Sequence, residues 1–227
     1  MSNSTEFSEN ILDTFRITST GVFLKPYHAQ RTFEAYQHLQ KGISYSQIVM
    51  IYDAVESELL SKFSKDQIVR IVFKCDFSYS FQMSDFEPLP EPIALHIRSD
   101  VRQTSGVGKQ NYKWESRPFW DELLKHTRNN TFDVISVNEK NHLVETSRFN
   151  IYAYDAKEDL IFTPPLSSGC INGVYRRHAF SSGYFDCSMG RKPLIERDLH
   201  LNEIKKFQLF VANSVRGVLS AALVSKT

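Results

Sequence analysis

Residues 145–176 read ETSRFNIYAYDAKEDLIFTPPLSSGCINGVYR, and this stretch decides the fold. VETSRFNIYAY, which begins one residue before the stretch, and LIFTPP, which lies within it, are rich in β-branched and aromatic residues and predict strands. A glycine-containing turn follows, and a helix is expected to open near Asn172. Polar and apolar residues recur through the stretch at set intervals. They are Glu145, Ser147, Asn150, Ile151, Tyr152, Ile161, Thr163, Ile171, Gly173, Val174 and Arg176.

The residues before this stretch predict a first unit of mixed helix and strand. Residues 10–24 alternate apolar and polar around Ser-Thr-Gly, which is the pattern of a β-hairpin. Residues 27–39 and 48–63 carry apolar side chains at helical spacing, and residues 68–77 and 79–89 have the composition of strands. We therefore expect an α+β arrangement in the first half of the chain.

A polar connector separates the two halves. The run SDVRQTSGVGKQNYKW, which starts at Ser99, is polar and contains glycine, as expected of an exposed loop at the start of a second unit. We place the boundary there, which gives domains of residues 1–98 and 99–227. After it, FDVISVN predicts another strand, and FQLFVANSVRGVLSAAL predicts a strand followed by a turn.

Composition narrows the class of protein. The chain has 227 residues, of which 41% are hydrophobic and 23% charged, as in ordinary globular proteins. Its formal net charge is +1 and its basic residues are scattered, so we expect no nucleic-acid partner. No signal sequence or membrane-spanning run is present, so we expect no membrane association and a cytoplasmic location. Three widely spaced cysteines and no histidine at zinc-ligand spacing predict no metal site.

The intervals in the first stretch, E-x-S-x-x-N-I-Y, I-x-T and I-x-G-V-x-R, resemble those of class-IV pyridoxal-phosphate aminotransferases. A looser resemblance extends from DTFR near residue 13 to NSVRG near residue 213. It implies an α/β (α+β), two-domain fold of the D-amino-acid/branched-chain aminotransferase-like type. The N-terminal domain would be the smaller, with pyridoxal 5'-phosphate at the domain interface. A homodimer and a small-molecule amine substrate are also implied.

The resemblance assigns the catalytic lysine. The family carries K-x-x-x-R upstream of the glutamate, and the matching residues here are Lys113 and Arg117. Lys113 would hold the cofactor as a Schiff base and later move the proton at the substrate carbon. The competing lysine is Lys109 in SGVGKQ, which also resembles a phosphate loop. Gln103 stands where that loop needs its first glycine, and Gln110 replaces its Ser or Thr.

Five further residues are assigned to the cofactor by the resemblance. Glu145 would keep the pyridine nitrogen protonated; otherwise it is a solvent-facing strand glutamate. Ile171 and Asn172 would bind the phosphate through backbone N–H groups at the helix start; otherwise the segment is a plain turn capped by Asn172. Arg31 in HAQR would contact the phosphate as a cation, or be a surface arginine on an amphipathic helix. Ser214 in ANSVRG would add a hydroxyl donor.

The N-terminal motif departs from the family. Many relatives have G-D-G-x-F-E-T, whereas this chain reads SENILDTFR, with Asp13 in place of the glutamate. The compact chain and its NSVRG ending favour the aminodeoxychorismate-lyase branch, which converts 4-amino-4-deoxychorismate to 4-aminobenzoate and pyruvate. The alternatives are an amino-acid transaminase that uses the same lysine and glutamate, and a pyridoxal-phosphate-binding protein without turnover.

Overall fold

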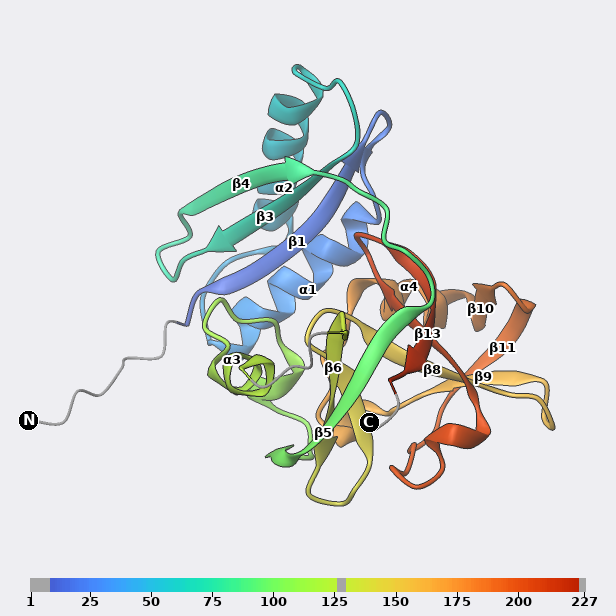
Figure 1. Cartoon of the computed structure of the whole chain (residues 1–227). Coiled ribbons are helices and arrows are strands. Elements are labelled where there is room, and N and C mark those ends of the chain that lie inside the picture. Colours follow the sequence, from blue (N-terminus) through green and yellow to red (C-terminus); the bar gives the residue numbers. More distant parts are fainter. Residues whose placement is uncertain (1–8, 126–129, 225–227) are drawn as a thin grey trace, which may run out of the picture. The chain divides into compact units, whose positions relative to one another are not determined.

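The computed structural model describes residues 9–125 and 130–224, which form two compact units (Figure 1). Unit 1 takes its described residues from the chain up to Phe86 and from Tyr112–Pro118. Unit 2 takes them from Glu87–Asn111 and from Phe119 onward. Both units contain helices and strands, so the expected mixed α/β class is confirmed.

Unit 1 is an antiparallel sheet with two helices. The strands lie in the order β2-β1-β3-β4, and the expected hairpin and helices are present. Apolar side chains from β1, β3, α1 and α2 form one core, in which Phe15 and Ile17 are fully buried. A capping box between Ser44 and Gln47 fixes the start of α2. The elements are β1 (Ile11–Thr18), β2 (Gly21–Val22), α1 (Lys25–His38), α2 (Tyr45–Leu60), β3 (Gln67–Phe73) and β4 (Tyr79–Asp85).

The segment Tyr112–Pro118 returns to unit 1 and pairs with β1. The backbone N–H of Leu12 donates to the Lys113 carbonyl at 2.9 Å, and Trp114 forms an antiparallel bridge with Ile11. The Tyr112 ring stacks on His38 with 4.6 Å between centroids. These contacts attach Lys113 to the sheet of unit 1. The boundary predicted at residue 99 places Lys113 instead in the second domain, residues 99–227.

The boundary expected near Ser99 falls inside a strand of unit 2. Strand β5 (Ile93–Gln103) runs through that position and pairs with β6 as far as Gln103, with a register shift between Arg98 and Arg102. Backbone pairing does not depend on side-chain polarity, so this polar stretch forms a strand despite its composition. The irregular connector begins only after Gln103.

Unit 2 is built around a closed ring of strands. Strand β7 pairs with both β6 and β8, so β8, β12, β13, β5, β6 and β7 form a continuous circuit, and β9, β11 and β10 extend it from β8. Apolar side chains of these strands form its largest core cluster. Besides β5, the elements are α3 (Pro118–Leu124), β6 (Asp133–Asn138), β7 (Leu143–Thr146), β8 (Asn150–Asp155), β9 (Leu160–Thr163), α4 (Val174–Ser182), β10 (Tyr184–Cys187), β11 (Gly190–Glu196), β12 (Gln208–Asn213) and β13 (Gly217–Leu223), with short 3-10 turns at Lys109–Asn111, Leu166–Ser168 and Ile204–Lys206.

The predicted strand VETSRFNIYAY is in fact two strands. A turn at residues 147–149 separates β7 from β8, and the two are paired at Glu145 and Asn150. The Thr146 hydroxyl accepts hydrogen bonds from the N–H groups of Arg148 and Phe149, and the Asp133 carboxylate accepts one from Ser147. These side-chain acceptors replace strand pairing with a turn.

Among the described residues, none of the helices has the length and hydrophobicity needed to cross a membrane.

Candidate active site

Lys113 lies in unit 1 with its amine beside a hydroxyl. The amine donates to Thr14 Oγ1 at 3.0 Å. Burial and the positive charge of Arg31 lower the pKa of Lys113 to about 7, against the opposing pull of Asp13. Near neutral pH a large fraction of the lysine is therefore an uncharged amine, which is the form that attacks an aldehyde. Lys109 is exposed on a 3-10 turn.

A fully buried carboxylate, that of Asp13, organises the polar groups near this lysine. It accepts hydrogen bonds from His28 Nδ1 at 2.7 Å, from Tyr52 Oη, from the N–H of Thr14 at 2.8 Å and from the Arg31 guanidinium. Burial raises its pKa, but the neighbouring His28 and Arg31 outweigh that effect and hold it well below the usual range. Arg31 contributes a charge that does not depend on pH in the physiological range, whereas burial lowers the pKa of His28.

Arg31 is therefore no surface residue. It is 7% exposed and belongs to the buried face of α1, three residues after His28. Its guanidinium is paired with Asp13, and its charge acts on Lys113. An arginine presents five donors in a fixed fork, so this pairing leaves the guanidinium with donor capacity beyond what Asp13 uses. The sequence interpretation of Arg31 as a phosphate ligand stays a prediction.

Glu145 lies in unit 2 and is also buried, with 4% of its surface exposed. One carboxylate oxygen accepts the N–H of Ile171 at 3.1 Å, and the other accepts Asn150 Nδ2 at 3.2 Å. The alternative of a solvent-facing strand glutamate is thus excluded. An ionised carboxylate is an acceptor only, which is the type of group that an N–H of a ring nitrogen requires as its partner.

The segment around Ile171 leads into α4. Helix α4 has Gly173 as its N-cap residue, which supplies no side-chain hydrogen bond, so Asn172 does not cap the helix. A Cβ at Gly173 would lie 2.1 Å from Asn150 Oδ1, so any other residue there would force the Asn150 side chain to move. The N–H of Asn172 donates to the Asn111 carbonyl at 3.2 Å. A phosphate bound at Ile171 and Asn172 would have to share these two N–H groups or replace their present acceptors.

Ser214 lies in the turn between β12 and β13 and is 5% exposed. The preceding Asn213 shapes that turn, because its side-chain oxygen accepts the N–H groups of Val215 and Arg216 at 3.0 and 2.7 Å.

The predicted site residues are divided between the two units. Lys113 and Arg31 belong to unit 1, and Glu145, Ile171, Asn172 and Ser214 belong to unit 2.

The chemistry of these donors fits pyridoxal phosphate. A largely uncharged lysine amine suits its aldehyde, a buried carboxylate suits its ring nitrogen, and a buried arginine suits its phosphate. Two residues of the candidate site were not predicted from the sequence. Thr14 stands in the quoted DTFR motif without an assigned role, and Asn111 lies in a polar connector whose composition predicts only a solvated loop.

The sequence matches the family model of amino-transferase class IV over residues 10–224. The chain belongs to this family. Class IV aminotransferases are enzymes that use pyridoxal phosphate. The match spans both units, so the predicted family membership and fold type are confirmed.

Solved structures of low sequence identity share the fold. A Mesorhizobium loti protein provisionally described as an amino-acid aminotransferase aligns with a TM-score of 0.81 at 20% identity, over 95% of this chain and 99% of that one. A 4-amino-4-deoxychorismate lyase from Pseudomonas aeruginosa gives 0.75 at 14%, over 96% and 83%. An aminotransferase from Brucella abortus bound to the cofactor gives 0.74 at 15%, over 98% and 83%. No curated protein sequence matches the chain.

Proposed function

We propose that the protein is a pyridoxal-phosphate-dependent lyase resembling aminodeoxychorismate lyase. It would convert 4-amino-4-deoxychorismate to 4-aminobenzoate and pyruvate. The observation that carries the proposal is the hydrogen bond between Lys113 Nζ and Thr14 Oγ1 at 3.0 Å. A lyase of this kind has to remove one proton from the substrate carbon and supply another to the departing group. A lysine and a hydroxyl in contact provide two proton-carrying atoms at one place.

The roles of the two residues follow from their contact. When bound, pyridoxal phosphate supplies an electron sink for negative charge at the substrate carbon. Lys113 Nζ would hold the cofactor and, as a free amine, would take the proton from that carbon as the ring becomes aromatic. The carbon–oxygen bond to the pyruvyl group breaks. Thr14 Oγ1 would give its proton to the departing enolpyruvate and be reprotonated by Lys113, so the proton taken from carbon leaves with the product and the lysine is again a neutral amine.

The remaining residues would bind the cofactor. Glu145 would accept the hydrogen bond of the protonated ring nitrogen. The phosphate would be bound by Arg31, by the N–H groups of Ile171 and Asn172, and by the hydroxyl of Ser214. Support comes from the burial of Glu145, Arg31 and Ser214, because buried polar groups with this chemistry are rare outside binding sites and ion pairs.

The first experiment tests the lysine. Purified protein is incubated with pyridoxal phosphate, its visible spectrum is recorded before and after borohydride, and the labelled peptide is mapped. A Schiff-base band trapped on Lys113 is expected, absent in Lys113→Ala and retained in the matched control Lys109→Ala. A label on any other lysine contradicts the proposal.

The second experiment tests the reaction. The enzyme loaded with the cofactor is given 4-amino-4-deoxychorismate, and 4-aminobenzoate and pyruvate are quantified. Equal amounts of both products are expected. Amine transfer to a keto acid without pyruvate release would make the protein a class IV amino-acid transaminase. A Schiff base with neither reaction would make it a cofactor-binding protein without turnover.

We further propose that the protein acts as a cytoplasmic homodimer, as the family resemblance implies. Sedimentation at several protein concentrations measures the mass, and cell fractionation locates the protein. A monomer at every concentration, or recovery with membranes, contradicts this proposal.

A further inference from the structure

The backbone carbonyls of residues 166–172 in unit 2, which we name the α4 entry loop, all accept hydrogen bonds from outside the loop. Such complete pairing is unusual for seven consecutive residues outside strands and α-helices, because loops ordinarily turn their carbonyls to water. The Leu166 carbonyl accepts from Asn111 Nδ2 at 3.0 Å, that of Ser167 from the Gly106 N–H at 2.7 Å, and that of Ser168 from Asn138 Nδ2 at 3.1 Å. The Gly169 carbonyl accepts from Gln103 Nε2 at 2.5 Å, and that of Cys170 from Asn111 Nδ2 at 2.7 Å. The Ile171 carbonyl accepts from Asn150 Nδ2 at 2.9 Å, and that of Asn172 from Arg177 Nε at 3.0 Å.

Fixing a carbonyl also fixes the next N–H group. A trans peptide is planar, with its C=O and N–H on opposite sides, so a donor that holds one end sets the direction of the other. The Cys170 carbonyl accepts from Asn111, which sets the N–H of Ile171. The Ile171 carbonyl accepts from Asn150, which sets the N–H of Asn172. These are the two N–H groups assigned to the cofactor phosphate.

Asn111 has the largest share in this arrangement. Its amide nitrogen donates to the carbonyls of Leu166 and Cys170, so one side chain holds both ends of a five-residue span. Its side-chain oxygen accepts the N–H of Gly108 at 2.7 Å, and its own carbonyl accepts the N–H of Asn172. The residue is 6% exposed, so water competes little for these bonds.

The loop has little regular structure. Only the 3-10 turn at its start is regular structure, and Gly169 has a φ of 105° and lies close to the backbone of Thr104, where a Cβ would meet the carbonyl oxygen at 2.7 Å. The shape of the loop thus depends on side chains donated by its neighbours. None of those from Gln103, Asn111 and Asn138 belongs to the family pattern of residues 145–176.

We propose that Asn111 is a positioning residue for phosphate binding. It acts through the Leu166 and Cys170 carbonyls, without touching the phosphate, and holds the α4 entry loop in the conformation in which the N–H of Ile171, bonded here to Glu145, can be shared with an anion. The inference rests on the proposed binding of pyridoxal phosphate. It predicts that the loss of Asn111 weakens the recognition of the phosphate and spares that of the rest of the cofactor.

The experiment compares pyridoxal phosphate with pyridoxal, which has the same aldehyde and ring and no phosphate. Schiff-base absorbance gives both Kd values for wild type and Asn111→Ala, and their ratio isolates the phosphate contribution. In Asn111→Ala we expect the ratio of Kd for pyridoxal to Kd for the phosphate to fall about tenfold, equal to about 1.4 kcal/mol. Hydrogen exchange of the protein without cofactor should be faster at residues 170–173 in the variant.

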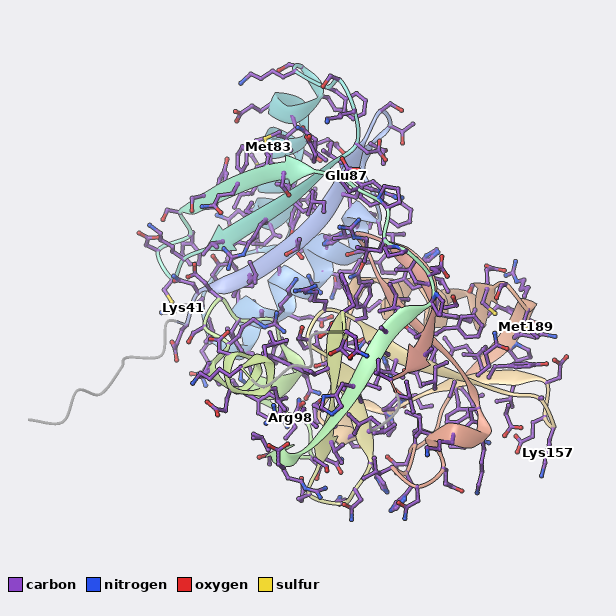
Figure 2. All side chains as sticks on the ribbon, in the orientation of Figure 1. Lys41, Met83, Glu87, Arg98, Lys157 and Met189 are labelled. Atoms are coloured by element: carbon purple, nitrogen blue, oxygen red, sulfur yellow. The ribbon has the colours of Figure 1, made fainter. Side chains whose placement is uncertain are left out.

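The matched control is Arg98→Met. Arg98, labelled on β5 in Figure 2, is also buried in unit 2 and donates to a carbonyl, that of Leu123, but has no bond to the α4 entry loop. Its Kd ratio should equal that of the wild type.

A second variant tests the loop should Asn111→Ala fail to fold. Gln103→Met removes the bond to the Gly169 carbonyl, while Ser136 can still donate to the Glu145 carbonyl. Its Kd ratio should fall in the same direction.

The outcomes separate the two proposals. An unchanged Kd ratio and unchanged exchange in Asn111→Ala overturn the role of Asn111, whether or not the wild type binds the cofactor. Equal weakening of both ligands means general destabilisation and also overturns it. If the wild type forms no Schiff base with either ligand, the proposed function fails, and exchange at residues 170–173 still decides whether Asn111 holds the loop.

Discussion

The polar groups around Lys113 and those around Glu145 are built on different principles. In unit 1 the groups are charged, because Asp13, Arg31 and the lysine act on one another through their charges. In unit 2 the Glu145 carboxylate accepts hydrogen bonds from two neutral donors, the Asn150 amide and the N–H of Ile171. Charge changes the protonation of a neighbour, whereas neutral hydrogen bonds chiefly fix direction. The first group is suited to proton chemistry and the second to holding a ligand in place.

The largest effect is expected from removing the lysine. Lys113→Ala should lower kcat by about 10³-fold or more, because it removes both the covalent attachment and the proton carrier. Steady-state kinetics with saturating cofactor measures it. Lys109→Ala, four residues away on an exposed turn, should retain wild-type kcat. Equal losses in the two variants would refute the assignment of Lys113.

Stability should separate the charged group from the neutral one. Asp13→Asn leaves Arg31 without its buried counter-ion and should cost about 3–5 kcal/mol of unfolding free energy. Glu145→Gln replaces one of the two accepting oxygens by an NH₂ group, which cannot accept a hydrogen bond. This variant should lose about 1–3 kcal/mol of unfolding free energy. Urea unfolding measures both values. A smaller loss for Asp13→Asn than for Glu145→Gln would show that charge is not what distinguishes the two regions.

Thr14 tests the proton chemistry of unit 1 alone. Thr14→Val keeps the shape of the side chain and removes the hydroxyl that accepts from Lys113, so kcat should fall about 10–100-fold, within the range of general acid catalysis or somewhat below it. Thr14→Ser keeps the hydroxyl and should recover most of the rate. Kinetics of pyruvate release measures both. Full activity in Thr14→Val would remove Thr14 from the mechanism.

A dependence of stability on pH tests the charge of Lys113 itself. The folded-state pKa of Lys113 is about 7, below its ordinary value of 10.5, so the unfolded chain binds more protons between these two values. Stability contributed by this group therefore rises as pH increases from 7 toward 10.5 and is lowest below 7. Denaturation of wild type and Lys113→Met across this range measures the difference. A difference that falls with rising pH would contradict the lowered pKa.

Local patterns predicted much of the fold, and contacts distant in sequence account for what was missed. The spacing of HAQR places His28 and Arg31 on one helix face, and both are buried there. Nothing in the sequence pairs Asp13 with Tyr52, because they lie 39 residues apart and meet only through tertiary packing. The polar connector predicted a loop, yet Asn111 within it is buried, because its amide donates to the carbonyls of Leu166 and Cys170.

Among the site residues, too, local patterns predicted the residue types, and the contacts distant in sequence were not predicted. Glu145 was recognisable because it begins a dense pattern of fixed intervals, and its burial agrees with that pattern. The acceptors of the Ile171 and Asn172 N–H groups could not be foreseen, since one is a carboxylate 26 residues away and the other a backbone carbonyl of Asn111. A sequence pattern identifies residue types, and hydrogen-bond partners depend on the folded chain.

The chain passes from one unit to the other three times, after Phe86, Asn111 and Pro118. Neither unit is consequently encoded by a single uninterrupted stretch. A fragment ending at Phe86 would lack the lysine and the backbone partner of Leu12, while one starting at Glu87 would carry seven residues whose pairing strand had been removed. Dissection of this enzyme into separately expressed halves would require a permuted chain or a linker in place of Tyr112–Pro118.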